Sequence, residues 1–173
     1  MRKTFVWMTL GCCLMAVALV AWAQGTRKPG LWEMTATMTW QKTPLPPGVT
    51  MPAGMASPFA ATTHTSQMCI TQAMIDKYGA PVPPGQGDCK VTNIVMKPTG
   101  MTADMVCTGK MNATATIVTT WSDANSSKSN VHFTGSMQMG PNATPIEFTI
   151  ESLSVYKGAD CGSVKPLPMP SDK

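Results

Sequence analysis

A two-residue alternation of apolar side chains leaves little choice of secondary structure for much of this chain. In residues 30–41 every second position from Trp32 to Trp40 is apolar, and threonine or glutamate occupies the positions between them. Successive side chains of a β-strand point to opposite faces, so the pattern predicts a strand with one buried and one hydrated face. We therefore expect Trp32 in the core and Thr35 in solvent.

Further alternating segments predict a mainly β fold. We expect strands at 62–70, 89–97, 101–108, 110–122, 131–139 and 146–155. Thr71 and Gly79 are suited to begin and end a short helix over 72–78. Six or seven strands with one helix indicate an antiparallel barrel or a strongly curved sheet.

Two local features refine the expected strands. The polar run 123–130 predicts a turn before the strand that begins at Val131. In the last strand the apolar positions change parity between Ile150 and Leu153, which predicts a β-bulge near Glu151.

Proline marks the segments that lie outside the sheet. Residues 42–60 contain five prolines, and proline removes a backbone donor, so we expect a long surface loop there. The proline-containing end of the chain, 164–173, is expected to be a disordered tail. Residues 24–163 then form a single domain, since a chain of this size builds one core.

The N-terminal segment has the three parts of a secretory signal. Two basic residues come before an apolar stretch over 5–20, and Ala21 and Ala23 provide the small residues of a cleavage site. Cleavage after Ala23 makes residues 1–23 a signal peptide and Gln24 the mature N-terminus. The alternative of an uncleaved anchor is disfavoured because the stretch is shorter than the roughly 20 residues of a membrane span.

Lipidation at Cys12 or Cys13 is a further alternative for this segment. Apolar residues continue after both cysteines, so a lipidated product would keep part of the signal core. We expect a periplasmic or secreted protein of a Gram-negative bacterium instead, with no stable membrane span after cleavage.

The cysteines that remain after cleavage are expected to form two disulfides. An even number of cysteines without a C-x-x-C pair is typical of an oxidising compartment. Four cysteines allow three pairings, and the sequence does not decide among them. We prefer Cys69–Cys89, which staples the segment between two strands, with Cys107–Cys161, which ties down the C-terminus.

Few residues are suited to acid–base or nucleophilic chemistry. The chain has 2 histidines, His64 and His132, and no G-x-S-x-G, H-E-x-x-H or paired-carboxylate motif. We therefore expect a protein that is not an enzyme and needs no cofactor. Removal of the two basic residues of the signal leaves 11 Lys + Arg against 9 Asp + Glu, and these are scattered singly, which argues against nucleic acid as a partner.

Methionine is unusually frequent, with 16 in the chain. Thioether and imidazole ligands bind Cu(I), so His64 with Met68 and Met137 with Met139 are candidate ligands of a periplasmic copper site. The alternative, which we favour, is that methionine replaces leucine as an adaptable core residue.

Several short motifs resemble one family. In chain order these motifs are Lys28-Pro29-Gly30-Leu31-Trp32-Glu33, Gln67-Met68-Cys69-Ile70-Thr71, Cys89-Lys90-Val91-Thr92-Asn93, Phe133-Thr134-Gly135-Ser136-Met137 and Gly158-Ala159-Asp160-Cys161. Together they resemble the bacterial exported "domain of unknown function 3617" family. The resemblance implies an exported protein and carries no catalytic residue.

These observations favour a binding or structural domain of the cell envelope. A curved sheet with an aromatic and methionine-rich face, beside a long loop, is suited to hold a small apolar ligand or another envelope component. A periplasmic Cu(I)-binding protein is the alternative.

Overall fold

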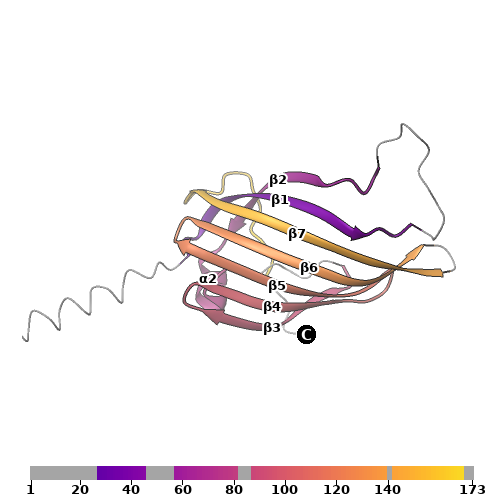
Figure 1. Cartoon of the computed structure of the whole chain (residues 1–173). Coiled ribbons are helices and arrows are strands. Elements are labelled where there is room, and N and C mark those ends of the chain that lie inside the picture. Colours follow the sequence, from indigo (N-terminus) through magenta and orange to yellow (C-terminus); the bar gives the residue numbers. More distant parts are fainter. Residues whose placement is uncertain (1–26, 46–56, 82–86, 140–141, 170–173) are drawn as a thin grey trace, which may run out of the picture.

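A seven-stranded antiparallel sheet forms most of the domain (Figure 1). The computed structural model describes residues 27–45, 57–81, 87–139 and 142–169. The elements are β1 (Gly30–Lys42), β2 (Thr62–Ile70), α2 (Gln72–Tyr78), β3 (Cys89–Lys97), β4 (Gly100–Cys107), β5 (Met111–Asp123), β6 (Ser126–Met139) and β7 (Asn142–Gly158). The predicted mainly β fold with one short helix is confirmed.

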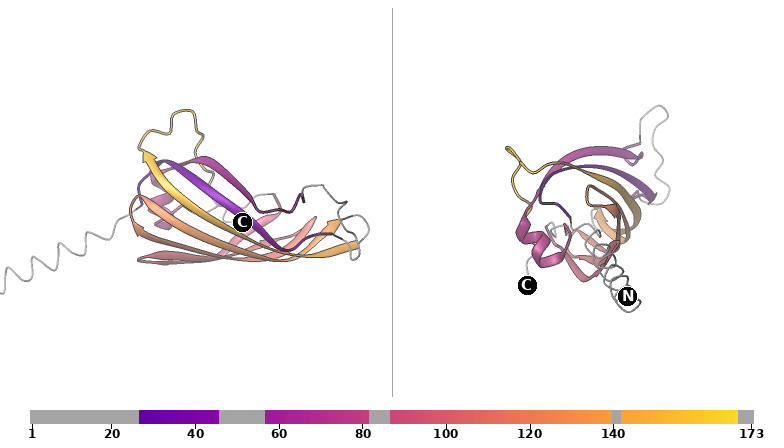
Figure 2. Two further views of the ribbon diagram at one scale, coloured as in Figure 1. Left: turned by 45° about the horizontal axis from the view of Figure 1, so that its top comes forward. Right: turned by 90° about the vertical axis from the view of Figure 1, so that its left-hand side faces the viewer.

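The sheet is strongly curved but open. Its strand order is β2-β1-β7-β6-β5-β4-β3, so the β1–β2 hairpin joins the others through β7. The strands wrap around a concave face, as the end-on view shows (Figure 2). β2 and β3 are the two edges and do not pair with each other, which makes this a curved sheet and not a closed barrel.

The alternating pattern separates the two faces of the sheet as expected. Trp32 on the concave side is only 1% exposed, whereas Thr35 on the convex side is exposed. Thr35 contacts Thr65 of the neighbouring β2 through their hydroxyl oxygens at 3.2 Å, and Thr37 contacts Thr63 in the same way at 2.9 Å. Such cross-strand threonine pairs allow a sheet to present a hydrated face without losing packing.

α2 covers one end of the concave face. The hydroxyl of Thr71 accepts a hydrogen bond from the amide of Met74, and Gly79 ends the helix with φ 70°. Met74 and Ile75 are buried with Trp32 and Ile70, so the helix packs into the sheet through its apolar side. We call this the helix end of the domain, and the opposite end the far end.

Two strands differ from the sequence-based expectation. β6 begins at Ser126, so the predicted turn over 123–130 is wrong for most of its length. Asp123 pairs with Ser126 across the turn, and the polar residues that follow pair with strands on both sides. Ladder hydrogen bonds on both sides outweigh the low strand propensity of serine and asparagine.

The predicted bulge near Glu151 is also wrong. β7 begins at Asn142, and its pairing with β1 and β6 runs without a shift through residues 148–155. Leu153 and Val155 consequently lie on the convex face, where they are 45% and 38% exposed. Ser152 and Ser154 occupy the concave positions instead, because continuous pairing on both sides fixes the parity of a central strand.

Both disulfides are present, with a pairing that differs from the expected one. The bonds are Cys69–Cys161 and Cys89–Cys107. Cys89 lies directly opposite Cys107 in the β3–β4 hairpin, so these two cysteines meet without any long-range folding. The preferred pairing of Cys69 with Cys89 is therefore wrong, since β2 and β3 are opposite edges of the sheet.

The C-terminal segment is partly ordered. The amide of Leu167 donates to the carbonyl oxygen of Cys69 at 2.9 Å, and Leu167 packs against the helix-end cluster. The expected disordered tail therefore does not hold for residues 164–169, and residues 170–173 lie outside the described ranges. In the proline-rich segment 42–60, residues 46–56 also lie outside them, while Pro44 is fully buried.

Candidate functional site

Four aromatic rings form a continuous row on the concave face at the far end. Trp40 on β1 contacts Phe148 on β7, with 4.8 Å between ring centroids, and Phe148 stacks on Phe133 of β6 at 4.5 Å. Phe59, near the end of the proline-rich segment 42–60, meets Trp40 edge-on at 5.5 Å. We call these four residues the aromatic row.

Strand pairing places the row. Trp40 is directly opposite Phe148, and Phe148 is directly opposite Phe133, so the three rings come from adjacent strands at one level of the sheet. Residues that face each other across an antiparallel pair point to the same side, which explains why the rings touch. Phe133 and Phe148 are buried, while Trp40 and Phe59 are only partly buried.

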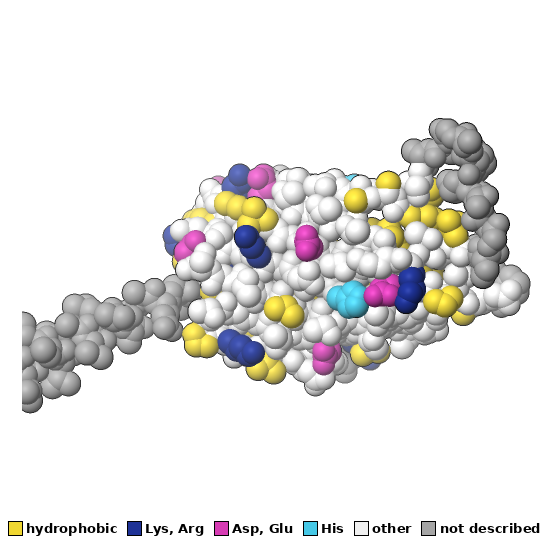
Figure 3. Space-filling model, viewed as in Figure 1, with side chains coloured by type: hydrophobic (Ala, Val, Ile, Leu, Met, Phe, Trp, Pro, Cys, Tyr) yellow, Lys and Arg dark blue, Asp and Glu magenta, His cyan; other side chains and the backbone are white. Residues whose placement is uncertain are grey.

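Flexible apolar side chains surround the row. Those that are partly buried against the same core cluster are Met38, Met105, Met111, Val131, Met137 and Ile150. Apolar side chains gather at this end of the molecule in the space-filling view (Figure 3). Methionine adapts its shape to neighbouring groups, and aromatic rings provide large apolar area, so this surface is suited to contact an apolar ligand.

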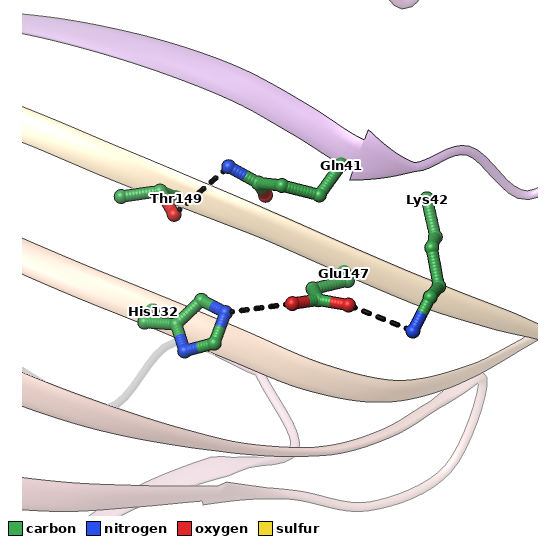
Figure 4. Close-up of polar contacts among 5 residues, drawn as sticks. All are labelled: Gln41, Lys42, His132, Glu147 and Thr149. Carbon is green, nitrogen blue, oxygen red and sulfur yellow. Dashed lines mark hydrogen bonds and ion pairs between the residues drawn. The ribbon is translucent and has the colours of Figure 1, made fainter.

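A polar cluster lies on the opposite, convex face. Glu147 of β7 forms an ion pair with Lys42 at 2.8 Å and contacts Nε2 of His132 at 3.2 Å, so the cluster joins β1, β7 and β6 (Figure 4). The hydrogen bond from Lys42 lowers the pKa of Glu147 most, and the contact with His132 lowers it further. His132 had been expected on the hydrated face, and its side chain is 47% exposed.

A shallow groove of about 310 Å³ runs beside His132 on the convex face. Half of its lining residues carry a hydroxyl or amide group, namely Thr92, Asn93, Thr114, Thr116 and Thr134, and Asp104 adds a carboxylate. Asn93 donates a hydrogen bond to Asp104 at 2.8 Å, so part of this lining is already satisfied internally. The groove therefore offers hydroxyl, amide and carboxylate groups beside His132.

The predicted copper ligands do not come together. His64 and Met68 lie on β2 at the sheet edge, and Met68 belongs to the helix-end cluster with Trp32. Met137 belongs to the far-end cluster and pairs with Thr144 of β7, which is about 40 Å along the strand from Tyr156, the β7 residue opposite Trp32. The side chain of Met139 lies outside the described residues.

The other predicted site residues fall into two groups. Cys69, Cys89, Cys107 and Cys161 are all held in disulfides, so none is a thiolate ligand. The cleavage-site residues Ala21, Ala23 and Gln24 lie outside the described part of the chain. Within that part, no group of three or more His, Cys, Asp or Glu side chains is arranged to hold a metal ion, and no helix is long and apolar enough to cross a bilayer.

Sequence reasoning missed two residues of structural importance. Phe59 was assigned to the proline-rich loop and not to the core, yet its ring meets that of Trp40 on β1. Arg27 comes before the first strand, yet it is 3% exposed. Neither has a periodic pattern around it, and periodicity was the main guide.

Comparison with known proteins identifies the family but not an activity. The family model described as a protein of unknown function (DUF3617) matches residues 27–161. No curated protein and no solved structure matches the chain. The matched range covers the whole sheet, the helix and both disulfides. The chain therefore belongs to the DUF3617 family of proteins of unknown function.

Proposed function

We propose that this protein is a non-enzymatic domain of the cell envelope that binds an apolar ligand at the aromatic row. The observation that carries the proposal is the contact chain from Phe59 through Trp40 to Phe148 and Phe133. Phe59 and Trp40 are only partly buried, and Phe59 comes from a loop. Ligand sites are mostly apolar and aromatic, and they often lie where a loop meets the mouth of a curved sheet.

The distribution of titratable groups supports binding over catalysis. The four residues of the aromatic row are Trp and Phe, which have no titratable side chain. The convex cluster does contain His132 and Glu147, but both are engaged with each other, and Lys42 occupies the other carboxylate oxygen.

Two features support export to the envelope. The first 23 residues have the charge and hydrophobicity pattern of a signal peptide. Both pairs of cysteines lie at bonding distance in the fold, and disulfides of this kind persist in oxidising compartments. The intact mass of the chain recovered from a periplasmic fraction tests this part, and a product that begins at Gln24 is expected. A chain that retains residues 1–23, or carries lipid on a cysteine, would contradict it.

Titration with dansyl-undecanoic acid tests the binding site. We expect saturable binding with enhanced dansyl emission, and Phe59→Ala should weaken it by roughly tenfold, since loss of one aromatic contact corresponds to about 1.4 kcal/mol. Leu153→Ala is the matched control, because it removes an apolar side chain from the convex face. Equal effects of the two substitutions, or no saturable binding, would refute the proposed site.

A further inference from the structure

The edge of β2 has backbone groups that no described residue binds. The carbonyl of Cys69 points away from β1, because it accepts a hydrogen bond from Leu167 of the C-terminal segment. Backbone groups alternate in direction along an antiparallel strand, so those of Thr63, Thr65 and Gln67 also point away from β1. Among the described residues none of these three has a backbone partner on that side.

The C-terminal segment covers the edge of β2 at Cys69, but the rest of β2 lacks the side chains that normally protect a sheet edge. Residues 62–70 contain no Asp, Glu, Lys, Arg or Pro. The opposite edge, β3, has Lys90 and Lys97, and its pairing with β4 shifts between Thr92 and Val95, where Asn93 has φ 52°. Charged side chains and bulges prevent strand addition, and here they occur on one edge only.

We infer that β2 pairs with β2 of a second copy of this chain. An antiparallel pair centred on Thr65 extends the sheet across a two-fold axis and satisfies the outward groups of Thr63, Thr65 and Gln67 in both copies. It places Thr65 against its own counterpart and Thr63 against Gln67. The sheet already uses this type of contact, since Thr65 bonds Thr35 and Thr63 bonds Thr37 on the same convex face.

The chemistry of β2 favours a second copy over an unrelated strand. A two-fold contact places two copies of the same edge side by side, so an edge with one sign of charge repels itself. Around Thr65 this edge carries threonine, serine, glutamine and His64, which the pairing places opposite Ser66, and it has no Asp, Glu, Lys or Arg. Because β3 is protected, the pairing uses one edge per copy and closes at the dimer without forming a filament. Lateral pairing of one short strand buries little area, so we expect a weak dimer.

Sedimentation equilibrium of the exported, disulfide-bonded chain tests the inference. We expect the average mass to rise toward twice that of the monomer between about 1 and 100 μM. The amides of the two Thr65 residues donate the two hydrogen bonds at the two-fold axis, and Thr65→Pro removes both donors. The dissociation constant should therefore rise tenfold or more. Proline is tolerated at an edge where the amide faces solvent, so the free energy of unfolding of the monomer should change by less than about 1 kcal/mol.

Thr65→Ala is the matched control, because it removes the side chain and keeps the amide. It should change the dissociation constant by less than about threefold. Amide exchange provides a second measurement that does not depend on a variant. The amides of Thr63, Thr65 and Gln67 should exchange rapidly in dilute protein and become protected in the dimer, while that of Ser66 stays protected in both.

Three results would overturn the inference. One is a monomer at all concentrations up to about 100 μM. Another is a dimer that Thr65→Pro does not weaken. The third is protection of the same three amides in the monomer, which would show that a segment of the same chain covers the edge.

Discussion

The guanidinium of Arg27 lies over the indole ring of Trp121, with 4.8 Å from its central carbon to the ring centroid. Its two terminal nitrogens donate to the carbonyl oxygens of Asp123 and Ser126, at 3.1 and 2.8 Å, and so hold the turn between β5 and β6. Burial lowers the pKa of Arg27 to about 10, although the charge of Asp123 acts in the opposite direction. A residue that precedes the first strand thus connects it to a turn almost 100 residues away.

Arg27→Ala should destabilise the domain by about 2–4 kcal/mol, because it removes two hydrogen bonds from a charged donor and leaves their acceptors unpaired. Lys28→Ala is the matched control. Lys28 is exposed and bonds Asn125 of the same turn, so its loss should be below about 1 kcal/mol. Denaturant midpoints of the two variants measure the difference. Similar shifts would show that the buried contacts of Arg27 contribute little.

Trp32→Ala should cost about 3–5 kcal/mol, because a large ring that is 1% exposed is removed from the helix-end cluster. Thr35→Ala on the other face of β1 should cost less than about 1 kcal/mol, although it loses the contact with Thr65. Unfolding of the two variants by denaturant compares the faces directly. A greater loss at Thr35 than at Trp32 would contradict the assigned parity of β1.

Peptide mapping without reduction should recover Cys69 linked to Cys161 and Cys89 linked to Cys107. The sequence separations are 92 and 18 residues. On the chain-entropy model, loss of the Cys69–Cys161 bond, which closes the longer loop, should cost about 5 kcal/mol of stability. Loss of the Cys89–Cys107 bond should cost about 3 kcal/mol. Paired Cys→Ser variants measure both costs in the denaturant midpoint. Stoichiometric thiol labelling of the unreduced, unfolded protein would argue against the bonds.

Glu147→Gln should change how stability depends on pH. The pKa of Glu147 is lowered in the fold by its bond to Lys42, so its ionised form stabilises the domain above the unfolded pKa of about 4.5. That contribution is lost as the pH falls through the lower folded value. We therefore expect Glu147→Gln to be less stable than the native chain at pH 7, with a difference that disappears in acid as the pH falls through the lowered pKa of Glu147.

Thermal midpoints across this pH range provide the measurement for Glu147. Glu151→Gln is the control, because Glu151 lies exposed on the same face of β7. A difference that persists unchanged in acid would show that the ion pair with Lys42 is not its source.

Most of the strands were predictable because their periodicity is local. β1, β2 and β5 begin and end close to the expected positions, and so does α2 with its cap at Thr71. The aromatic row was partly predictable, since Trp40, Phe133 and Phe148 lie on the face that alternation assigned to the core. Phe59 was not, because its contact with Trp40 depends on how a long loop returns to the sheet.

The disulfides show where local reasoning was incomplete. The hairpin around residues 98–100 was expected, and its pairing alone places Cys89 opposite Cys107. The pairing of these two strands therefore identifies the partner of Cys89, whereas the spacing of the cysteines along the chain does not. Cys69 and Cys161 are a different case, because their contact requires the end of the chain to return to β2.

By itself, the sequence determines which side chains face the core in strands with unbroken alternation such as β1, because a strand allows two faces and burial of apolar area selects between them. Tertiary structure alone decides which strands are edges, how far the polar run of β6 extends and which face Leu153 takes. Those outcomes depend on hydrogen bonds to partners distant in sequence, and a central strand must satisfy two neighbours at once. Arg27 follows the same logic: its burial arises from a turn and two indole rings that only the folded sheet brings together.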